Sequence, residues 1–155
     1  MSLDVGSTLT LHVRQSDGSP LDLADYRGTD NVFVYFMRAL SCAQCNAAVR
    51  TLTAQQAELE AQHVRVVIAV PEDADSASAW KAKRGIPFPV VVGQEGTPHA
   101  DAGLLRKVFG AIQQSGGVLL DSQGVVRYAH VSTNPGASYS KAEVADAIAG
   151  LPAIV

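Results

Sequence analysis

Residues 31–45 carry the strongest structural signal in this chain: they read Asn31-Val-Phe-Val-Tyr-Phe-Met37, followed by Arg38-Ala-Leu-Ser-Cys42-Ala-Gln-Cys45. The first half is a continuous apolar run of strand length, and an alanine-rich segment with helical character follows over residues 46–62. A strand that delivers a C-x-x-C to the start of a helix is the arrangement that dithiol redox chemistry needs. We therefore predict that residues 31–37 form a buried strand and that Cys42 and Cys45, the only cysteines in the chain, form a redox pair.

The two cysteines are expected to differ in exposure and in role. The unpaired N–H groups of the first helical turn favour a thiolate at Cys42, which the preceding loop exposes. Helical spacing places Cys45 on an inward-facing stripe with Val49 and Leu52. We predict that Cys42 is the attacking thiol and Cys45 the resolving thiol. Arg38 either stabilises the Cys42 thiolate by its charge or is a solvated loop arginine.

Length and composition limit the classes of protein to consider. The chain has 155 residues, 47% of them hydrophobic and 17% charged, so we expect one globular domain over residues 1–155. A net charge of −3 gives no electrostatic reason to expect nucleic acid or an anionic membrane as a partner. No apolar run approaches the roughly 20 residues of a membrane helix, and the first residues do not resemble a secretory signal. We therefore expect a cytoplasmic protein with reduced cysteines.

The predicted elements alternate between strands and helices after the first third of the chain. Strands are expected over residues 5–15, 31–37, 64–70, 86–92, 118–121 and 125–131, with a further short element over residues 21–26. Helices are expected over residues 43–62, 71–84, 102–112 and 140–150. Residues 86–92 form either a short strand or an edge segment. The strand–helix–strand succession over residues 31–70 implies a parallel, right-handed crossover.

Four short stretches, taken in order, match one family. They read Asp22-Leu-Ala-Asp-Tyr-Arg-Gly28, Phe36-Met-Arg-Ala-Leu-Ser-Cys-Ala-Gln-Cys45, Gly85-Ile-Pro-Phe-Pro89 and Val118-Leu-Leu-Asp-Ser-Gln-Gly-Val-Val-Arg127. They resemble segments of the AhpC/TSA family, the peroxiredoxin-like branch of the thioredoxin-fold redoxins. The resemblance implies an α/β, thioredoxin-like fold with a central mixed sheet and helices on both faces. It also implies a thiol-dependent oxidoreductase that needs no cofactor, takes electrons from a thioredoxin- or glutathione-like thiol donor, and reduces peroxides or disulfides.

The active-site run departs from the family pattern. When Cys45 is aligned with the peroxidatic cysteine, Arg38 stands at the register of a proline and Cys42 at that of a threonine or serine. Ser115-Gly116-Gly117 stands where the family has an arginine, or thioredoxins a cis-proline. These changes remove groups that would hold peroxide oxygens, and the two glycines are expected to leave an open, backbone-rich cleft suited to protein disulfides. The family register would make Cys45 the attacking thiol, but we prefer Cys42 because helical periodicity buries Cys45.

Other functions remain open from the sequence. A copper(I) site that uses Cys42, Cys45 and Met37 is chemically reasonable, since soft sulfur ligands suit this ion. The chain would then be a copper(I)-binding or redox-sensing module without catalytic activity. A zinc site is disfavoured because the sequence offers no second cysteine pair. The four histidines (His12, His63, His99 and His130) are scattered and are expected at the surface or at strand ends, and Trp80 is expected to be a packing residue.

Overall fold

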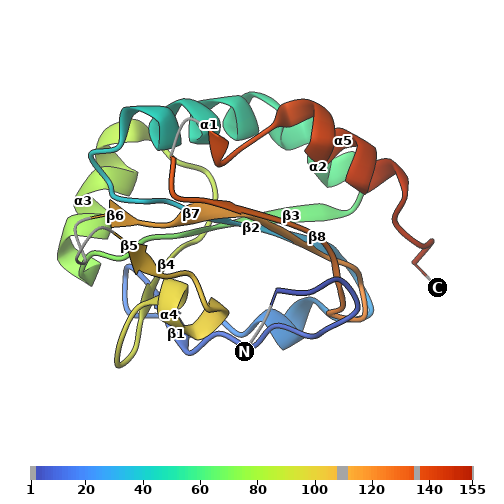
Figure 1. Ribbon diagram of the computed structural model, residues 1–155, viewed down its shortest axis with the longest axis horizontal. Helices are drawn as coiled ribbons and strands as arrows, with labels where there is room; N and C mark the ends of the chain where they lie inside the picture. Colours follow the sequence, from blue (N-terminus) through green and yellow to red (C-terminus); the bar gives the residue numbers. More distant parts are fainter. Residues whose placement is uncertain (1–2, 108–111, 135–136, 155) are drawn as a thin grey trace.

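The computed structural model describes residues 3–107, 112–134 and 137–154. Within these ranges, six strands form one mixed sheet in the order β1-β4-β3-β2-β7-β8 (Figure 1). β2 lies at the centre of the sheet, parallel to β3 and antiparallel to β7, and every residue of β2 is buried. The strands are β1 (Val13–Gln15), β2 (Asn31–Phe36), β3 (Val64–Ala69), β4 (Val90–Gly93), β7 (Ser115–Leu120) and β8 (Val126–Ser132). The predicted buried strand and the parallel crossover are confirmed.

The other elements are short strands and helices. A two-stranded ribbon pairs β5 (Arg106–Lys107) with β6 (Ile112–Gln113). The described helices are η1 (Leu23–Tyr26), α1 (Ala43–Ala54), α2 (Gln56–Ala61), α3 (Ala74–Arg84), α4 (Pro98–Ala102) and α5 (Lys141–Ala149). None of the helices in the described ranges has both the length and the apolar character to span a bilayer.

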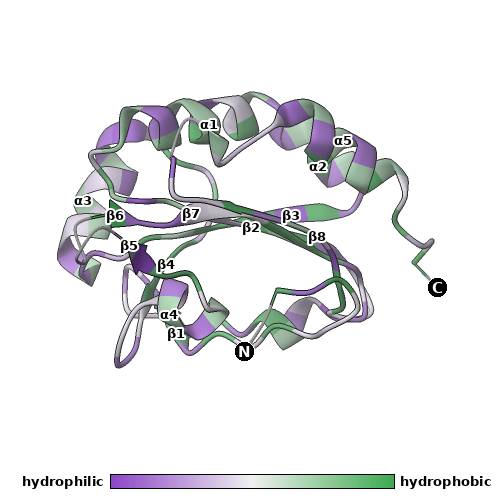
Figure 2. Cartoon of the chain, in the orientation of Figure 1, coloured by the Kyte–Doolittle hydropathy of each residue, from purple (hydrophilic) through white to green (hydrophobic). Residues whose placement is uncertain are grey.

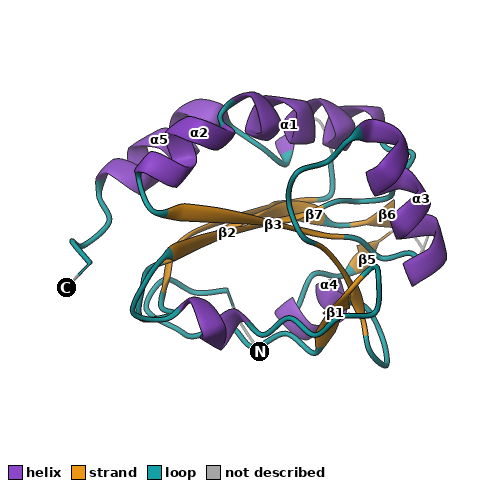
Figure 3. Ribbon diagram, turned by 180° about the vertical axis from the view of Figure 1, so that it is seen from behind, coloured by secondary structure: helices purple, strands orange, loops and turns teal. Residues whose placement is uncertain are grey.

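Helices lie on both faces of the sheet, as predicted, but unequally. α1, α2 and α5 cover one face, while η1, α4 and the N-terminal segment lie on the other (Figures 1 and 3). Alternate residues of β2 supply the two cores: Phe33 and Tyr35 pack on the face of the long helices, and Val34 and Phe36 on the opposite face. Figure 2 shows apolar colouring concentrated along the strands and polar colouring on the outer surfaces of the helices. The architecture is a thioredoxin-like α/β fold.

The helix predicted over residues 43–62 is divided in two. α1 ends at Ala54, and α2 begins at Gln56. Two threonines in the last turns of α1 donate their hydroxyls to carbonyls four residues earlier, Thr51 to Ala47 at 3.2 Å and Thr53 to Val49 at 2.8 Å. Such bonds compete with the backbone ladder and bend helices. The predicted inward stripe is nevertheless confirmed, since Cys45, Val49 and Leu52 are all buried, and Leu59 of α2 is buried with them.

The helix predicted over residues 102–112 is wrong where the structure describes it. α4 ends at Ala102 because Gly103 adopts a left-handed conformation with φ 82°. The chain then forms β5 and β6, and residues 108–111 lie outside the described ranges.

Smaller corrections concern strand and helix boundaries. In the predicted strand over residues 5–15, only Val13–Gln15 is a strand, and it pairs with β4, so β4 is not an edge strand. Residues 23–26 are a 3-10 helix. The helix predicted from residue 71 begins at Ala74, because Asp73 caps it by accepting the Ser76 N–H at 2.8 Å. The strands predicted over residues 118–121 and 125–131 are confirmed as the hairpin of β7 and β8, and the helix predicted over residues 140–150 is confirmed as α5, which Ser140 caps.

Candidate functional site

Both cysteines lie at the first turn of α1, directly after the central strand. The pair lies at the start of a helix, as predicted: Cys42 is the N-cap of α1, and its Sγ accepts the N–H of Cys45 at 3.2 Å. Both thiols are free, and both residues have 0% exposed surface. The inward position of Cys45 is confirmed, but the predicted exposure of Cys42 is wrong. Cys42 belongs to the buried cluster on the helix face of the sheet, and Leu40 packs against that cluster.

The surroundings of Cys45 favour its neutral thiol. Burial, followed by a hydrogen bond to Cys42, raises the pKa of Cys45 to about 11. Two hydrogen bonds, from the Arg38 backbone N–H at 3.4 Å and from the Tyr35 hydroxyl, act in the opposite direction. At neutral pH Cys45 is therefore protonated, and it donates toward the sulfur of Cys42. A protonated thiol is a poor nucleophile until it loses its proton.

Arg38 lies beside the pair but contacts it through the backbone. Its N–H donates to Cys45 Sγ, whereas its side chain lines a cavity of about 160 Å³ together with Glu72 and Arg106. The Arg38 Nε atom is buried and has no hydrogen-bond partner among the described residues. The charge effect on Cys42 expected from the sequence stays a prediction, and the observed contribution of Arg38 is the hydrogen bond to the other sulfur.

Two side chains that were not predicted as site residues hold the loop over residues 38–42, and a third holds one of these two in place. Glu72, after β3, accepts the N–H of Leu40 through Oε2 at 2.9 Å. Asn46, on α1, donates through Nδ2 to the carbonyls of Leu40 at 2.8 Å and of Cys42 at 2.9 Å. Trp80, on α3, donates its indole N–H to Asn46 Oδ1 at 2.9 Å. Trp80 is buried, as expected of a packing residue, but it is also part of this polar network.

His99, on α4, is a buried residue and not the surface or strand-end residue that we predicted. It has 0% exposed surface, and its Nε2 lies 2.6 Å from the carbonyl of Met37, the residue before Arg38. The ring meets Phe36 edge-on with centroids 5.3 Å apart. Burial lowers the pKa of His99 to about 4, so the ring is neutral at pH 7. Because a carbonyl can only accept, Nε2 carries the proton.

The open cleft expected at Gly116 and Gly117 is also wrong. Both glycines are buried in β7, next to the end of β2. A Cβ at Gly117 would collide with the ring of Phe33, and a Cβ at Gly116 would collide with the carbonyl of His130. The glycines are therefore present because packing leaves no room for a side chain.

Tyr35 lies on the central strand β2, where its hydroxyl is hydrogen-bonded to Cys45. Its hydroxyl and Ser138 Oγ are 2.8 Å apart, and Tyr35 has 0% exposed surface. Burial, with smaller contributions from both cysteines, raises the pKa of Tyr35 above its ordinary value, so the phenol keeps its proton. The hydroxyl can therefore serve Cys45 as a hydrogen-bond donor.

The described residues contain no group of three or more His, Cys, Asp or Glu side chains placed to hold a metal ion. Met37, the third sulfur ligand in the copper(I) hypothesis, is buried in the same cluster as both cysteines. The structure thus leaves that alternative as a hypothesis.

Comparison with known proteins supports the fold and shows the family of this chain. The model of the AhpC/TSA family matches residues 7–129. No curated protein matches the sequence. A peroxiredoxin-like protein from Aquifex aeolicus superposes with a TM-score of 0.78 at 13% identity, covering 96% of this chain and 88% of that one. Peroxidoxin BcpB from Mycobacterium tuberculosis gives 0.75 at 16% identity, covering 94% of both chains. A putative thiol:disulfide interchange protein DsbE from Chlorobium tepidum gives 0.73 at 22% identity, covering 95% of this chain and 99% of that one. At sequence identities between 13% and 22%, the structural similarity to these three proteins establishes the fold of this chain.

Proposed function

The chain belongs to the AhpC/TSA family, and we propose that it is a thiol-dependent oxidoreductase that cycles Cys42 and Cys45 between dithiol and disulfide. The observation that carries the proposal is the hydrogen-bonded pair itself. The sulfur of Cys42 caps the first turn of a helix, and a neutral thiol with a raised pKa lies next to it.

In the first step, the Cys42 thiolate attacks one sulfur of a substrate disulfide, the substrate S–S bond breaks, and the departing thiolate takes up a proton. Cys45 then loses its proton and attacks the Cys42 sulfur of the mixed disulfide. The second substrate thiol leaves, and the Cys42–Cys45 disulfide remains. With a peroxide, the Cys42 thiolate instead attacks one peroxide oxygen, the O–O bond breaks, and the other oxygen leaves as an alcohol or water after taking up a proton. Cys45 then attacks the sulfur of the resulting sulfenic acid, which forms the disulfide and releases water. A thioredoxin- or glutathione-like donor returns two electrons and restores both thiols.

Cys45 is suited to the second step. Its hydrogen bonds from Arg38 and Tyr35 would stabilise the thiolate that must form when the mixed disulfide is resolved. Until then, its raised pKa keeps Cys45 protonated and therefore a poor nucleophile toward the substrate.

Trapping of intermediates tests these roles. Cys45→Ser is expected to accumulate a stable mixed disulfide with a substrate disulfide, and Cys42→Ser is expected to form none; the Cys42→Ser/Cys45→Ser double variant is the control. Mass spectrometry of the intact protein measures both. The reverse pattern would make Cys45 the attacking thiol, and no adduct in either single variant would contradict the proposed activity.

The substrate class is decided by a second measurement. Insulin reduction and the rate of peroxide consumption are compared in the same preparation with a dithiol donor. Peroxide oxidation no faster than that of free cysteine would leave disulfide exchange as the activity.

A further inference from the structure

We propose that Glu72 and Asn46 form a clamp on the peptide groups of Leu40 and that the opening of this clamp controls access to Cys42. The inference rests on the proposed function in one respect, because it takes Cys42 as the thiol that must meet the substrate. Both residues act on the loop and not on the reacting sulfur, so they are positioning residues.

Leu40 is held from two sides by side chains of different elements. Its N–H donates to Glu72 Oε2 at 2.9 Å, and its carbonyl accepts from Asn46 Nδ2 at 2.8 Å. The loop of residues 38–42 has no strand or helical ladder of its own. These two side chains therefore replace the backbone pairing that a regular element would supply.

The orientation of the Asn46 amide follows from its neighbours. The indole N–H of Trp80 can only donate, and it lies 2.9 Å from Oδ1. Nδ2 must therefore face the carbonyls of Leu40 and Cys42, which can only accept. Since Asn46 is 4% exposed, water cannot easily replace these bonds.

The clamp closes over the thiol that has to react. Cys42 has no exposed surface, so neither a disulfide nor an alkylating reagent can reach its sulfur in this conformation. Leu40 packs on the cluster that contains Cys42, and Asn46 also holds the Cys42 carbonyl. Movement of residues 38–42 is the local opening that would expose the sulfur. Loss of one hydrogen bond to a charged group is expected to raise the open population about tenfold or more.

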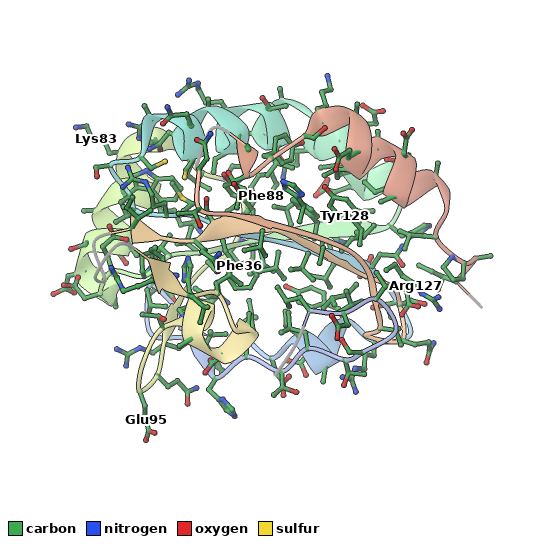
Figure 4. The ribbon with its side chains drawn as sticks, in the orientation of Figure 1. Phe36, Lys83, Phe88, Glu95, Arg127 and Tyr128 are labelled. Carbon is green, nitrogen blue, oxygen red and sulfur yellow. The ribbon has the colours of Figure 1, made fainter. Side chains whose placement is uncertain are left out.

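Alkylation of a single thiol measures this opening directly. In the Cys45→Ser background, where Cys42 is the only thiol, the rate of reaction with iodoacetamide is compared among Glu72→Ala, Glu72→Gln and Glu95→Ala. Glu72→Ala removes the acceptor of the Leu40 N–H, and the alkylation rate of Cys42 is expected to rise about tenfold or more. Glu72→Gln keeps an oxygen within reach but loses the charge, so it is expected to react at a rate between those of the parent and Glu72→Ala. Glu95→Ala is the matched control, since Glu95 is exposed at the tip of the loop that follows β4 (Figure 4).

Equal rates in Glu72→Ala and Glu95→Ala would overturn the proposal, provided that Trp80 fluorescence shows both variants to be folded. If Glu72→Ala does not fold, hydrogen exchange of the Leu40 amide in the unmodified protein decides instead. Strong protection is expected, and exchange at the rate of an open loop would overturn the proposal. Alkylation requires no turnover, so the two proposals can fail separately. If the trapping experiment gives no adduct but Cys42 is alkylated faster in Glu72→Ala, the proposed function is refuted and the clamp stands.

Discussion

Protonation of His99 is expected to destabilise the folded protein in mild acid. The buried ring has a pKa of about 4, against 6.5 for an ordinary histidine, so between these values protons bind preferentially to the unfolded chain. Stability should therefore fall as the pH falls from about 6.5 toward 4, and the contribution should be fully present above 6.5. The difference between the two values corresponds to about 3 kcal/mol of unfolding free energy. Arg106, the charged group that acts on His99, contributes in the same direction as burial.

Urea unfolding followed by the fluorescence of Trp80 measures this loss. The matched variant is His99→Gln, whose amide can still donate to the Met37 carbonyl but does not titrate. Acidic groups that also titrate in this range affect both proteins equally. Asp121 is an example: burial acts to raise its pKa, but hydrogen bonds from Arg127 and from backbone N–H groups lower it overall. The wild-type protein should lose about 2 to 3 kcal/mol more than His99→Gln between pH 7 and pH 4.5. Parallel stability curves for the two proteins would refute the assignment of a neutral, buried His99.

Three further predictions concern alkaline pH, packing and the hairpin. Because the pKa of Cys45 is raised to about 11, folding favours its neutral thiol, and the free energy of unfolding should decline as the pH rises from about 9 through 11. Urea unfolding measures this decline, which should be smaller in Cys45→Ala over the same pH range. Gly117→Ala should lower the free energy of unfolding by about 1 to 3 kcal/mol, because its Cβ collides with Phe33. Gly96→Ala is the control: its Cβ meets open space, so it should lower the free energy of unfolding by less. Equal effects of the two substitutions would argue against the packing interpretation. Asp121→Ala removes the acceptor of three hydrogen bonds in the β7–β8 turn and should lower the thermal midpoint, which calorimetry measures; an unchanged midpoint would show that these bonds contribute nothing.

The sequence predicted the features that depend on local pattern. A continuous apolar run identified β2, helical spacing identified the inward face of α1, and the N-cap at Cys42 followed from the position of the C-x-x-C. The left-handed Gly85 and the capping Ser140 ended and began helices where expected. The helix predicted over residues 102–112 failed because its apolar residues suit a helix and a ribbon equally. Gly103 then decided where the helix ends.

Burial of Cys42 could not be predicted in the same way, because the groups that cover and hold its loop come from distant parts of the chain. Leu40 bonds to Glu72 across 32 residues, and the Met37 carbonyl meets His99 across 62. In the sequence, Glu72 was one of several acids near the start of a helix, and His99 was one of four scattered histidines. Only the parallel packing of β2 and β3 brings the ends of these strands together, so that the loop after one can be held by a side chain that follows the other. The motif therefore fixes which sulfurs can react, while the clamp, supplied by tertiary structure, would set how often they are reached.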